Sequence, residues 1–459
     1  MDDKQSLLRK LPKIDALLAR AEGEGYVRLL GRRAVADLCR AAVDDAKSAA
    51  LAKGTGPDPE AIGLAVLEAC RQARSLILGR VVNGTGVLLH TNLGRAPLGA
   101  ALFDELRDAV SGYCNLEIDV LTRSRGRRGA ATTSLLAQLA GAQDALVVNN
   151  NAAVLFLVLR EFAAGREVII SRSELVQIGG GFRIPDILGA SGAALREVGT
   201  TNITTLDDYR AALGPKAALV LKVHQANFRM EGFVEAPDVR ALKAMGTGDA
   251  LLVSDLGSGN PARGSGVAAC EPTPADMIAQ GADLVCFSGD KMLGGVQAGV
   301  VAGRRDLVAR LSANPLMRVL RVDKIAFAAM GIVLRHHLNG EHGRVAVWAL
   351  ANAGEEEVRA RAESFIGKWG LVAERYEVVP STATFGGGST PGQGIPSFAM
   401  RVKGPGKPDE IARFFQEREP PVIGTVRNGS FEIDFRTVLP EDEPALGEAC
   451  RAFQDGRGG

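Results

Sequence analysis

The sequence lacks the features that mark membrane, metal-binding and disulfide-rich proteins. No uninterrupted apolar run is long enough to cross a membrane. The six cysteines are scattered, with no CxxC pair and no metal-ligand spacing, so we expect no metal site and reduced thiols that serve as packing residues. The N-terminus has no apolar core of the kind found in signal peptides. These absences predict a cytoplasmic protein that makes no contact with a membrane.

An excess of charge of one sign is also missing. The chain has 54 Lys and Arg residues against 53 Asp and Glu residues, a net charge of +1. DNA is therefore not expected as a partner, and any contact with RNA must come from local basic patches. A hydrophobic content of 46% and a charged content of 23% are typical of a soluble globular protein. The length of 459 residues exceeds that of one ordinary domain.

Hydrophobic periodicity predicts three domains. Residues 1–78 have apolar residues at helical spacing, which predicts a small helical module. Residues 79–340 alternate apolar strands with helical segments, a pattern typical of an α/β domain with a mostly parallel sheet. Residues 341–459 contain a predicted helix at 355–369, followed by strands and turns. This last part is expected to be a small α+β domain.

A lysine just after a predicted strand is the strongest candidate for catalysis. Residues 282–287 read as a buried strand, and Ser288, Asp290 and Lys291 follow in a glycine-containing turn. A lysine desolvated beside a cofactor suits a Schiff base with pyridoxal 5'-phosphate (PLP). The Ser288 hydroxyl and nearby backbone N–H groups suit its phosphate. The alternative is an ordinary loop lysine.

A carboxylate that suits the same cofactor follows the predicted strand at 250–254. PLP enzymes need an acid on the pyridine nitrogen, which keeps the ring protonated and able to accept electrons. A crossover containing a helix fits between Asp255 and Lys291, so both are expected at one edge of the sheet. A structural role for Asp255, capping the turn after the strand, is the alternative.

Further candidates for cofactor binding also follow predicted strands. Asn151, Ala152 and Ala153 open a helix after the strand at 145–148, where a helix N-terminus would hold the phosphate. A simple Asn cap is the alternative. His224 is a candidate to stack on or orient the cofactor, and a buried core histidine is equally consistent with the sequence.

Arginines cluster in three places. Arg95 ends a glycine-containing loop, and Arg318 and Arg321 are three positions apart, so in a helix they would share one face. Two guanidinium groups suit an oxyanion such as phosphate, although a surface salt-bridge face is the alternative. The basic run 123–128 contains a glycine and suits an anionic ligand or solvated loop charge. The glycines at 386–389 are expected to connect two strands rather than form a lid.

Several ordered motifs extend these observations over nearly the whole chain. They lie at 80–98, 147–153, 174–176 with 179–186, 198–202, 255–259, 287–291, 386–389 and 433–438. In this set the chain resembles the bacterial selenocysteine synthases, or L-seryl-tRNA(Sec) selenium transferases. The motifs are long and specific.

The resemblance implies a fold-type-I PLP-dependent enzyme. It implies a homo-oligomer with active sites at dimer interfaces, in which dimers assemble into a ring-shaped decamer and the N-terminal module binds the tRNA. Matched position by position, Lys291 is the Schiff-base lysine and Asp290 is an active-site acid. Arg95, Arg318 and Arg321 match the positions that bind the anionic selenium donor, selenophosphate.

The implied reaction starts from serine carried by seryl-tRNA(Sec). Lys291 removes the α-proton while Asp255 keeps the cofactor ring protonated, and water leaves from the β-carbon to give an aminoacrylate. Selenium from selenophosphate then adds to that carbon, which gives selenocysteinyl-tRNA(Sec) for selenoprotein synthesis. Departure of hydroxide requires a general acid, for which Asp290 is a candidate.

Two segments, 129–133 and 224–228, depart from the family pattern. The first departure removes polar contacts near the active-site entrance. It therefore leaves open an alternative, a PLP-dependent lyase or aminotransferase acting on a free small amino acid or sugar acid. A tRNA-binding protein that has lost catalysis is a third hypothesis, which Lys291 and Asp255 disfavour. The arginines and the helical module favour the tRNA-dependent reaction.

Overall fold

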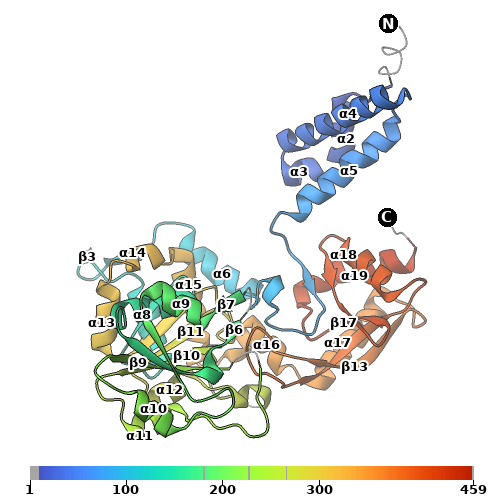
Figure 1. The fold of residues 1–459 in the computed structure, drawn as a ribbon. Coiled ribbons are helices and arrows are strands. Elements are labelled where there is room, and N and C mark those ends of the chain that lie inside the picture. The colour runs from blue at the N-terminus through green and yellow to red at the C-terminus, as the bar shows by residue number, and fades with distance from the viewer. Residues whose placement is uncertain (1–9, 179–180, 226–227, 265, 457–459) are drawn as a thin grey trace. The chain divides into compact units, whose positions relative to one another are not determined.

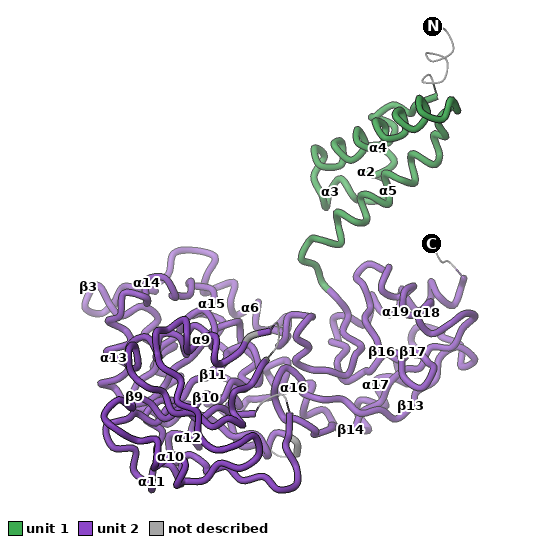
Figure 2. The backbone as a smooth tube through the Cα atoms, in the orientation of Figure 1, with its two compact units in different colours: residues 1–80 green, residues 81–459 purple. Residues whose placement is uncertain are grey.

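The chain forms two compact units, Met1–Arg80 and Val81–Gly459 (Figure 2). The predicted boundary near residue 340 falls inside the second unit, so a division of that unit into two domains stays a prediction. The computed structural model describes residues 10–178, 181–225, 228–264 and 266–456.

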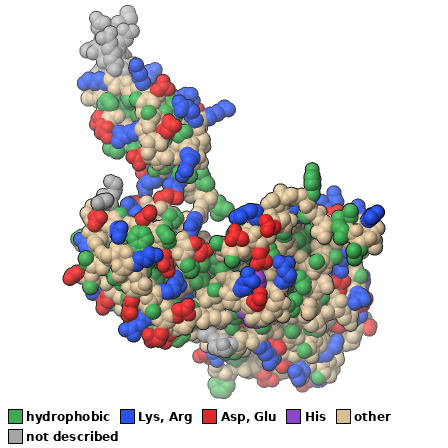
Figure 3. Space-filling view, turned by 180° about the vertical axis from the view of Figure 1, so that it is seen from behind, with side chains coloured by type: hydrophobic (Ala, Val, Ile, Leu, Met, Phe, Trp, Pro, Cys, Tyr) green, Lys and Arg blue, Asp and Glu red, His purple; other side chains and the backbone are tan. Residues whose placement is uncertain are grey.

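The first unit is built from helices packed around a small core. Its helices are α2 (Ile14–Gly23), α3 (Tyr26–Leu30), α4 (Arg32–Lys53) and α5 (Pro59–Ser75). Helix α5 begins where the Asp58 carboxylate accepts a hydrogen bond from the Glu60 N–H, with a proline at the first helical position. Leu17, Val35 and Val66 lie in the shared core. Figure 3 shows basic and acidic side chains interspersed on the visible face of this unit.

The second unit contains a seven-stranded sheet with the order β4-β12-β11-β10-β9-β5-β8. Its strands β9, β10 and β11 are labelled in Figure 1. Strand β12 runs antiparallel to both of its neighbours, and the other pairs are parallel. The prediction of a mostly parallel α/β sheet is therefore confirmed. The strands are β4 (Asp144–Val148), β5 (Glu167–Ser171), β8 (Ala194–Val198), β9 (Ala217–Val223), β10 (Leu251–Gly257), β11 (Leu284–Ser288) and β12 (Gly299–Gly303).

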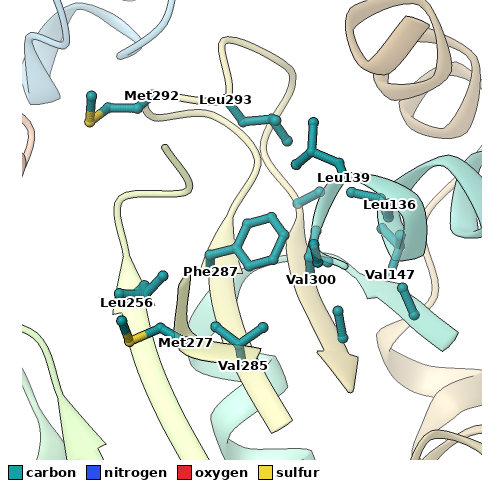
Figure 4. Packing of buried hydrophobic residues seen from close by; sticks show 14 of the residues in the cluster. Leu136, Leu139, Val147, Leu256, Met277, Val285, Phe287, Met292, Leu293 and Val300 are labelled. Carbon is teal, nitrogen blue, oxygen red and sulfur yellow. The ribbon is translucent and has the colours of Figure 1, made fainter. Parts of the chain in front are cut away.

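Both faces of this sheet are covered, which explains why its strands are nearly continuous apolar runs. Successive side chains of β11 enter different cores: Val285 and Phe287 belong to one buried cluster, Leu284 and Cys286 to the other. Figure 4 shows Phe287 and Val285 on the first of these faces, with Leu256 nearby.

Helices supply the covering layers. The first cluster includes side chains of α6 (Ala100–Val110), α7 (Ala130–Leu139), α10 (Leu206–Ala212), α11 (Val239–Met245), α12 (Pro274–Ala279), α15 (Lys324–Leu338) and α16 (Ala346–Asn352). The second includes those of α8 (Asn151–Phe162), α9 (Ile184–Ser191) and α13 (Arg305–Ala313).

The C-terminal part of the second unit contains an antiparallel sheet with the order β13-β14-β17-β16. The glycines at 386–389 lie in the connection between β13 and β14, as predicted. Helix α17 spans the predicted residues 355–369. The elements are α17 (Glu355–Trp369), β13 (Tyr376–Ala383), β14 (Ile395–Val402), α18 (Pro408–Gln416), β16 (Thr425–Arg427), β17 (Ser430–Asp434) and α19 (Glu443–Gln454).

Short elements complete the second unit. Strand β1 pairs with β15, which brings the first residues of this unit to its C-terminal part. The remaining short elements are β1 (Val82–Asn83), β2 (Ile118–Asp119), β3 (Ser124–Arg125), β6 (Gln177–Ile178), β7 (Phe182–Arg183), α14 (Met317–Leu320) and β15 (Val422–Ile423). Of the helices that the structure describes, none combines the length and the apolar character that a membrane span requires.

Candidate active site

Parallel strands of the central sheet end at one cavity of about 250 Å³. This is the edge at which ligands bind in open α/β sheets. Most of the residues predicted to bind the cofactor line it, together with Arg95 and Asp290. The lining includes Arg95, Asn150, Asn151, Ala152, His224, Asp255, Ser288, Asp290, Lys291 and Gln297.

Lys291 and Asp255 are brought together by neighbouring strands. Strands β10 and β11 pair in parallel with Asp255 opposite Cys286, and Lys291 follows the end of β11. Both side chains are buried. Burial lowers the pKa of Lys291, and the nearby Asp255 carboxylate partly opposes that shift. A lysine held in this way is biased toward the neutral amine, which is the nucleophilic and basic form.

The Asp255 carboxylate sits in an environment that disfavours its charge. Burial raises the pKa of Asp255, and the hydrogen bond from Asn151 opposes this most strongly, followed by the charges of Lys291 and His224. Asn151 Nδ2 donates to Asp255 Oδ1 at 2.8 Å. A buried carboxylate of this kind would be stabilised by a cationic N–H donor in the cavity.

The start of helix α8 combines a structural cap with a lining of the cavity. Asn150 is the N-cap, and its side chain accepts a hydrogen bond from the Ala153 N–H at 2.9 Å. The Ala153 N–H is thus already used, and Ala153 does not line the cavity, whereas Asn151 and Ala152 do. The predicted helix N-terminus is therefore present at the cavity, with Asn150 taking the capping role.

His224 and Ser288 also lie where the sequence places them, after β9 and at the end of β11. The His224 N–H donates to the Asp255 carbonyl at 2.9 Å, which fixes the histidine backbone to β10. The His224 Nδ1 atom is buried and has no hydrogen-bond partner among the described residues. Ser288 is buried and lines the cavity.

Arg95 reaches this cavity from a distant part of the chain. Its Nη1 donates to Asp290 Oδ2 at 2.6 Å, and the next residue, Ala96, donates its N–H to the Asp290 carbonyl at 3.2 Å. Arg95 has a φ of 64°, a conformation that residues other than glycine rarely adopt. Backbone of this kind often occurs at functional sites.

Arg318 and Arg321 line a different cavity within the same chain, one of about 340 Å³. Helix α14 has only four residues and ends before Arg321, so the two arginines do not share a helix face. Both are exposed, and neither side chain forms a hydrogen bond or ion pair with a described residue. The predicted basic loop meets them there, where Arg127 is paired with Asp144 and Arg128 with Glu117.

The first departure from the family pattern, 129–133, has a packing role. Gly129 precedes α7 with a φ of 63°, and a Cβ there would lie 2.2 Å from the Phe327 ring. Thr132 Oγ1 donates to the Phe327 carbonyl at 2.9 Å. In the second departure, 224–228, residues 226–227 lie outside the described residues.

Three lining or neighbouring residues were missed by sequence reasoning: Asn150, Gln297 and Glu271. Asn150 had a usable signal, since it immediately precedes the helix. Gln297 lies just before β12, an antiparallel strand that the sequence pattern did not reveal. Glu271 is buried within 3.6 Å of His224, a contact between residues far apart in the sequence.

The residues of the cavity fit PLP. Asp255 offers a buried carboxylate for the ring nitrogen, and Lys291 offers a buried amine with a lowered pKa. The start of α8 offers a helix N-terminus for the phosphate. His224 Nδ1 and Asn151 Oδ1 are buried without partners among the described residues, as expected where a polar ligand completes the site.

Comparison with known proteins agrees with this geometry. The model of the L-seryl-tRNA selenium transferase family matches residues 81–439, and the model of the N-terminal part of selenocysteine synthase matches residues 8–46. The protein of Hyphomonas neptunium is 40% identical over 458 residues, which cover 97% of this chain and 98% of that protein. The protein of Moorella thermoacetica is 40% identical over 464 residues and covers 97% of each. Both are named L-seryl-tRNA(Sec) selenium transferase.

A solved D-glucosaminate-6-phosphate ammonia-lyase has the same fold. Its TM-score is 0.60 at 17% identity, with 84% of this chain and 98% of that chain covered. The predicted fold-type-I PLP-dependent architecture is therefore confirmed, and PLP is the cofactor that the family and the fold indicate. The family match covers most of the chain, and the relatives match almost all of it. The chain belongs to the L-seryl-tRNA selenium transferase family.

Proposed function

We propose that this protein converts seryl-tRNA(Sec) to selenocysteinyl-tRNA(Sec), with PLP as cofactor and selenophosphate as selenium donor. The observation that carries the proposal is the meeting of Lys291 and Asp255 at one cavity, in a chain whose curated relatives are named for this reaction. The place of action is proposed to be the cytoplasm.

In this proposal the polar residues predicted from the sequence have chemical tasks in the cavity. Asp255 would hold the ring nitrogen of PLP, the start of α8 and Ser288 would hold its phosphate, and His224 would face its ring. When bound, the cofactor supplies an electron sink for the negative charge that develops at the serine α-carbon. Lys291 takes the α-proton at Nζ, since burial lowers the pKa of Lys291 and so favours the neutral amine.

Loss of the serine hydroxyl requires a proton, and the donor of selenium is an anion. Asp290 is the candidate to protonate the leaving hydroxide, because it is adjacent to Lys291 and lines the cavity. Its hydrogen bond also holds Arg95 at the cavity, where the guanidinium would bind an oxygen of selenophosphate.

We propose that Arg318 and Arg321 complete the anion site of a partner subunit in a homo-oligomer. Their guanidinium groups are exposed and form no ion pair with described residues, although they line a cavity. Large exposed apolar side chains support a partner surface. Tyr113 precedes strand β2, Leu121 lies in the turn between β2 and β3, and Val319 lies between the two arginines. Dimers of this kind would assemble further into the ring-shaped decamer that the family resemblance implies.

The helical module is proposed to bind the tRNA. Its net charge is modest, and several basic residues are already paired, such as Arg20 with Glu60. Arg28 and Arg33 are exposed and form no hydrogen bond or ion pair with described residues. Such cations are available to phosphate groups, while the overall shape of the helices would provide most of the recognition.

A comparison of three substrates separates this function from that of a lyase acting on a small free substrate. The visible absorbance of the PLP-loaded protein is followed while seryl-tRNA(Sec), free serine and a free sugar acid are added separately. The proposal predicts a spectral change with seryl-tRNA(Sec) at micromolar concentration and none with the free compounds. A spectral change with free serine or the sugar acid, together with no binding of the tRNA, contradicts it.

A further inference from the structure

A buried acid beside the cavity, Glu271, has no role in the reaction described so far. It follows the short 3₁₀ helix Gly266–Cys270 and is only 3% exposed. Its Oε1 atom lies 3.6 Å from Nδ1 of His224, and both atoms are buried without a hydrogen-bond partner among the described residues. A donor and an acceptor thus face each other just beyond hydrogen-bond distance.

Glu271 is held by two further hydrogen bonds, one to its side chain and one to its backbone. Its Oε2 accepts a hydrogen bond from the Thr390 N–H at 3.1 Å, in the loop between β13 and β14. Its backbone carbonyl accepts from Asn260 Nδ2 at 2.8 Å, and Asn260 lies shortly after β10, the strand of Asp255. These two hydrogen bonds fix Glu271 with its Oε1 atom toward His224. A closer approach of the two side chains would therefore come from a movement of the His224 imidazole.

Glu271 also belongs to the set of charges around Lys291. The negative charges of Asp255, Asp290 and Glu271 favour the protonated form of Lys291, whereas Arg95 disfavours it. The Asp290 charge is neutralised in part by its ion pair with Arg95. Glu271 faces His224 and the Thr390 N–H, and no ion pair with Lys or Arg is found for it among the described residues.

We propose that Glu271 is a positioning residue, which accepts a hydrogen bond from Nδ1–H of His224 when PLP fills the cavity and so fixes the imidazole against the cofactor. The inference rests on the proposed function, because it assumes the PLP site. A movement of about 0.7 Å brings the two atoms to an ordinary hydrogen-bond distance. The carboxylate also fixes the tautomer of His224 and adds negative charge near Lys291.

The two effects are separable by substitution. Glu271→Gln keeps the shape and removes the charge, whereas Glu271→Asp keeps the charge and withdraws it from His224 by one methylene. Glu432→Gln is the matched control, since Glu432 is also buried but pairs with Arg401 in the C-terminal sheet, outside the cavity lining. Thermal unfolding of each variant reports any loss of stability.

The first measurement is the pH midpoint of the visible absorbance of bound PLP. We expect Glu271→Gln to lower this midpoint by about one pH unit, because removal of a nearby negative charge disfavours the protonated form of the Lys291 nitrogen. Glu271→Asp and Glu432→Gln are expected to keep the midpoint of the unaltered protein. An unchanged midpoint in Glu271→Gln overturns the electrostatic part of the proposal.

The second measurement is the rate of PLP dissociation in Glu271→Asp, His224→Asn and the double variant. If Glu271 acts through His224, both single variants release PLP faster, and the double variant is no faster than His224→Asn. Additive effects overturn the positioning role, as do unchanged rates accompanied only by a lower melting temperature. A protein that shows no visible band with PLP refutes both the proposed function and this inference. A normal band without selenium transfer refutes the proposed function alone.

Discussion

Arg95 Nη1 donates a hydrogen bond to Asp290 Oδ2 at 2.6 Å, which joins two residues 195 positions apart beside Lys291. The Asp290 side chain is 9% exposed and that of Arg95 is 37% exposed, so the acid depends on the arginine more than the reverse. The pair links the loop that precedes helix α6 to the turn that carries Lys291.

The first prediction concerns the stability that this pair provides. Arg95→Ala should lower the free energy of unfolding by about 1–2 kcal/mol, because it leaves a mostly buried carboxylate without its partner. Arg95→Ala combined with Asp290→Asn should recover part of that loss. Urea denaturation of the unaltered protein and of the two variants measures these free energies, and a double variant no more stable than Arg95→Ala would contradict the dependence.

The second prediction concerns Arg318 and the proposed partner subunit. Arg318→Ala should abolish most selenium transfer while the visible absorbance of bound PLP stays intact. Lys291→Ala should also be inactive. When the two variants are co-expressed and assemble at random, half of the dimers are mixed. Each mixed dimer has one intact site of its two, so about a quarter of the original activity should return.

Arg335→Ala is the control for the loss of an exposed arginine, since Arg335 is paired with Glu105 and lines neither cavity. It should remain active by itself. Absence of any recovery in the co-expressed pair would mean that Arg318 does not act in the site of a partner.

The third prediction concerns the buried charge of Asp255 in the protein without cofactor. Burial raises the folded-state pKa of Asp255 above its ordinary value of 3.8. Between these two pKa values the folded state binds more protons than the unfolded state, so the free energy of unfolding falls as pH rises through this interval. Asp255→Asn should therefore melt at a higher temperature than the unaltered cofactor-free protein at pH 7.

That advantage should vanish below a pH of about 4, where the carboxyl is protonated in both states. Scanning calorimetry of both cofactor-free proteins at pH 7 and at acidic pH tests the sign. The same variant should lose most activity, because the ring nitrogen loses its acid. Equal melting temperatures at pH 7 would show that the Asp255 charge is already compensated in the folded protein.

The fourth prediction concerns His337, which supports the turn after Lys291. Its Nε2 lies 2.8 Å from the Leu293 carbonyl, and burial lowers the pKa of His337 to about 4. The unfolded chain takes up a proton on this residue near pH 6.5, so stability is lost as pH falls from about 6.5 toward 4.

Protonation of this residue in the unfolded chain should lower the free energy of unfolding by about 2 kcal/mol when the pH falls from 7 to 5. His337→Gln can still donate to the carbonyl and does not titrate, so its stability should change less over the same interval. Urea denaturation at the two pH values gives both differences, and identical pH dependence in the two proteins would rule out the His337 contribution.

The fifth prediction concerns Arg28 and Arg33 of the helical module, which form no ion pair with described residues. Arg28→Ala with Arg33→Ala should weaken the binding of seryl-tRNA(Sec) and lower the slope of binding against salt concentration, since fewer counterions are released. Arg20→Ala is the control, because Arg20 is already paired with Glu60. Binding titrations at several salt concentrations measure both slopes, and equal slopes for the control and the double variant would argue against the assignment.

The sequence predicted those parts of the site that depend on local pattern. Asp255 and Lys291 stand at the ends of apolar runs, and parallel strands bring such ends together. Helices α8 and α17 could also be predicted, because a capping residue and a run of helix-forming residues are local signals.

The remaining parts depend on contacts between distant segments. The pairing of Arg95 with Asp290, and the position of Glu271 beside His224, follow from how loops cross the sheet edge, which periodicity does not encode. Helical spacing predicted one shared face for Arg318 and Arg321, whereas α14 ends between them. They share a cavity because a loop and a short helix meet there.

Transfer of radiolabelled selenium from selenophosphate to seryl-tRNA(Sec) is the direct test of the proposed reaction. The aminoacyl group is released from the tRNA after the reaction and identified by mass spectrometry. We expect labelled selenocysteine with the unaltered protein and none with Lys291→Ala. Transfer by Lys291→Ala at the full rate, or turnover of free serine by a protein that does not bind the tRNA, would contradict it.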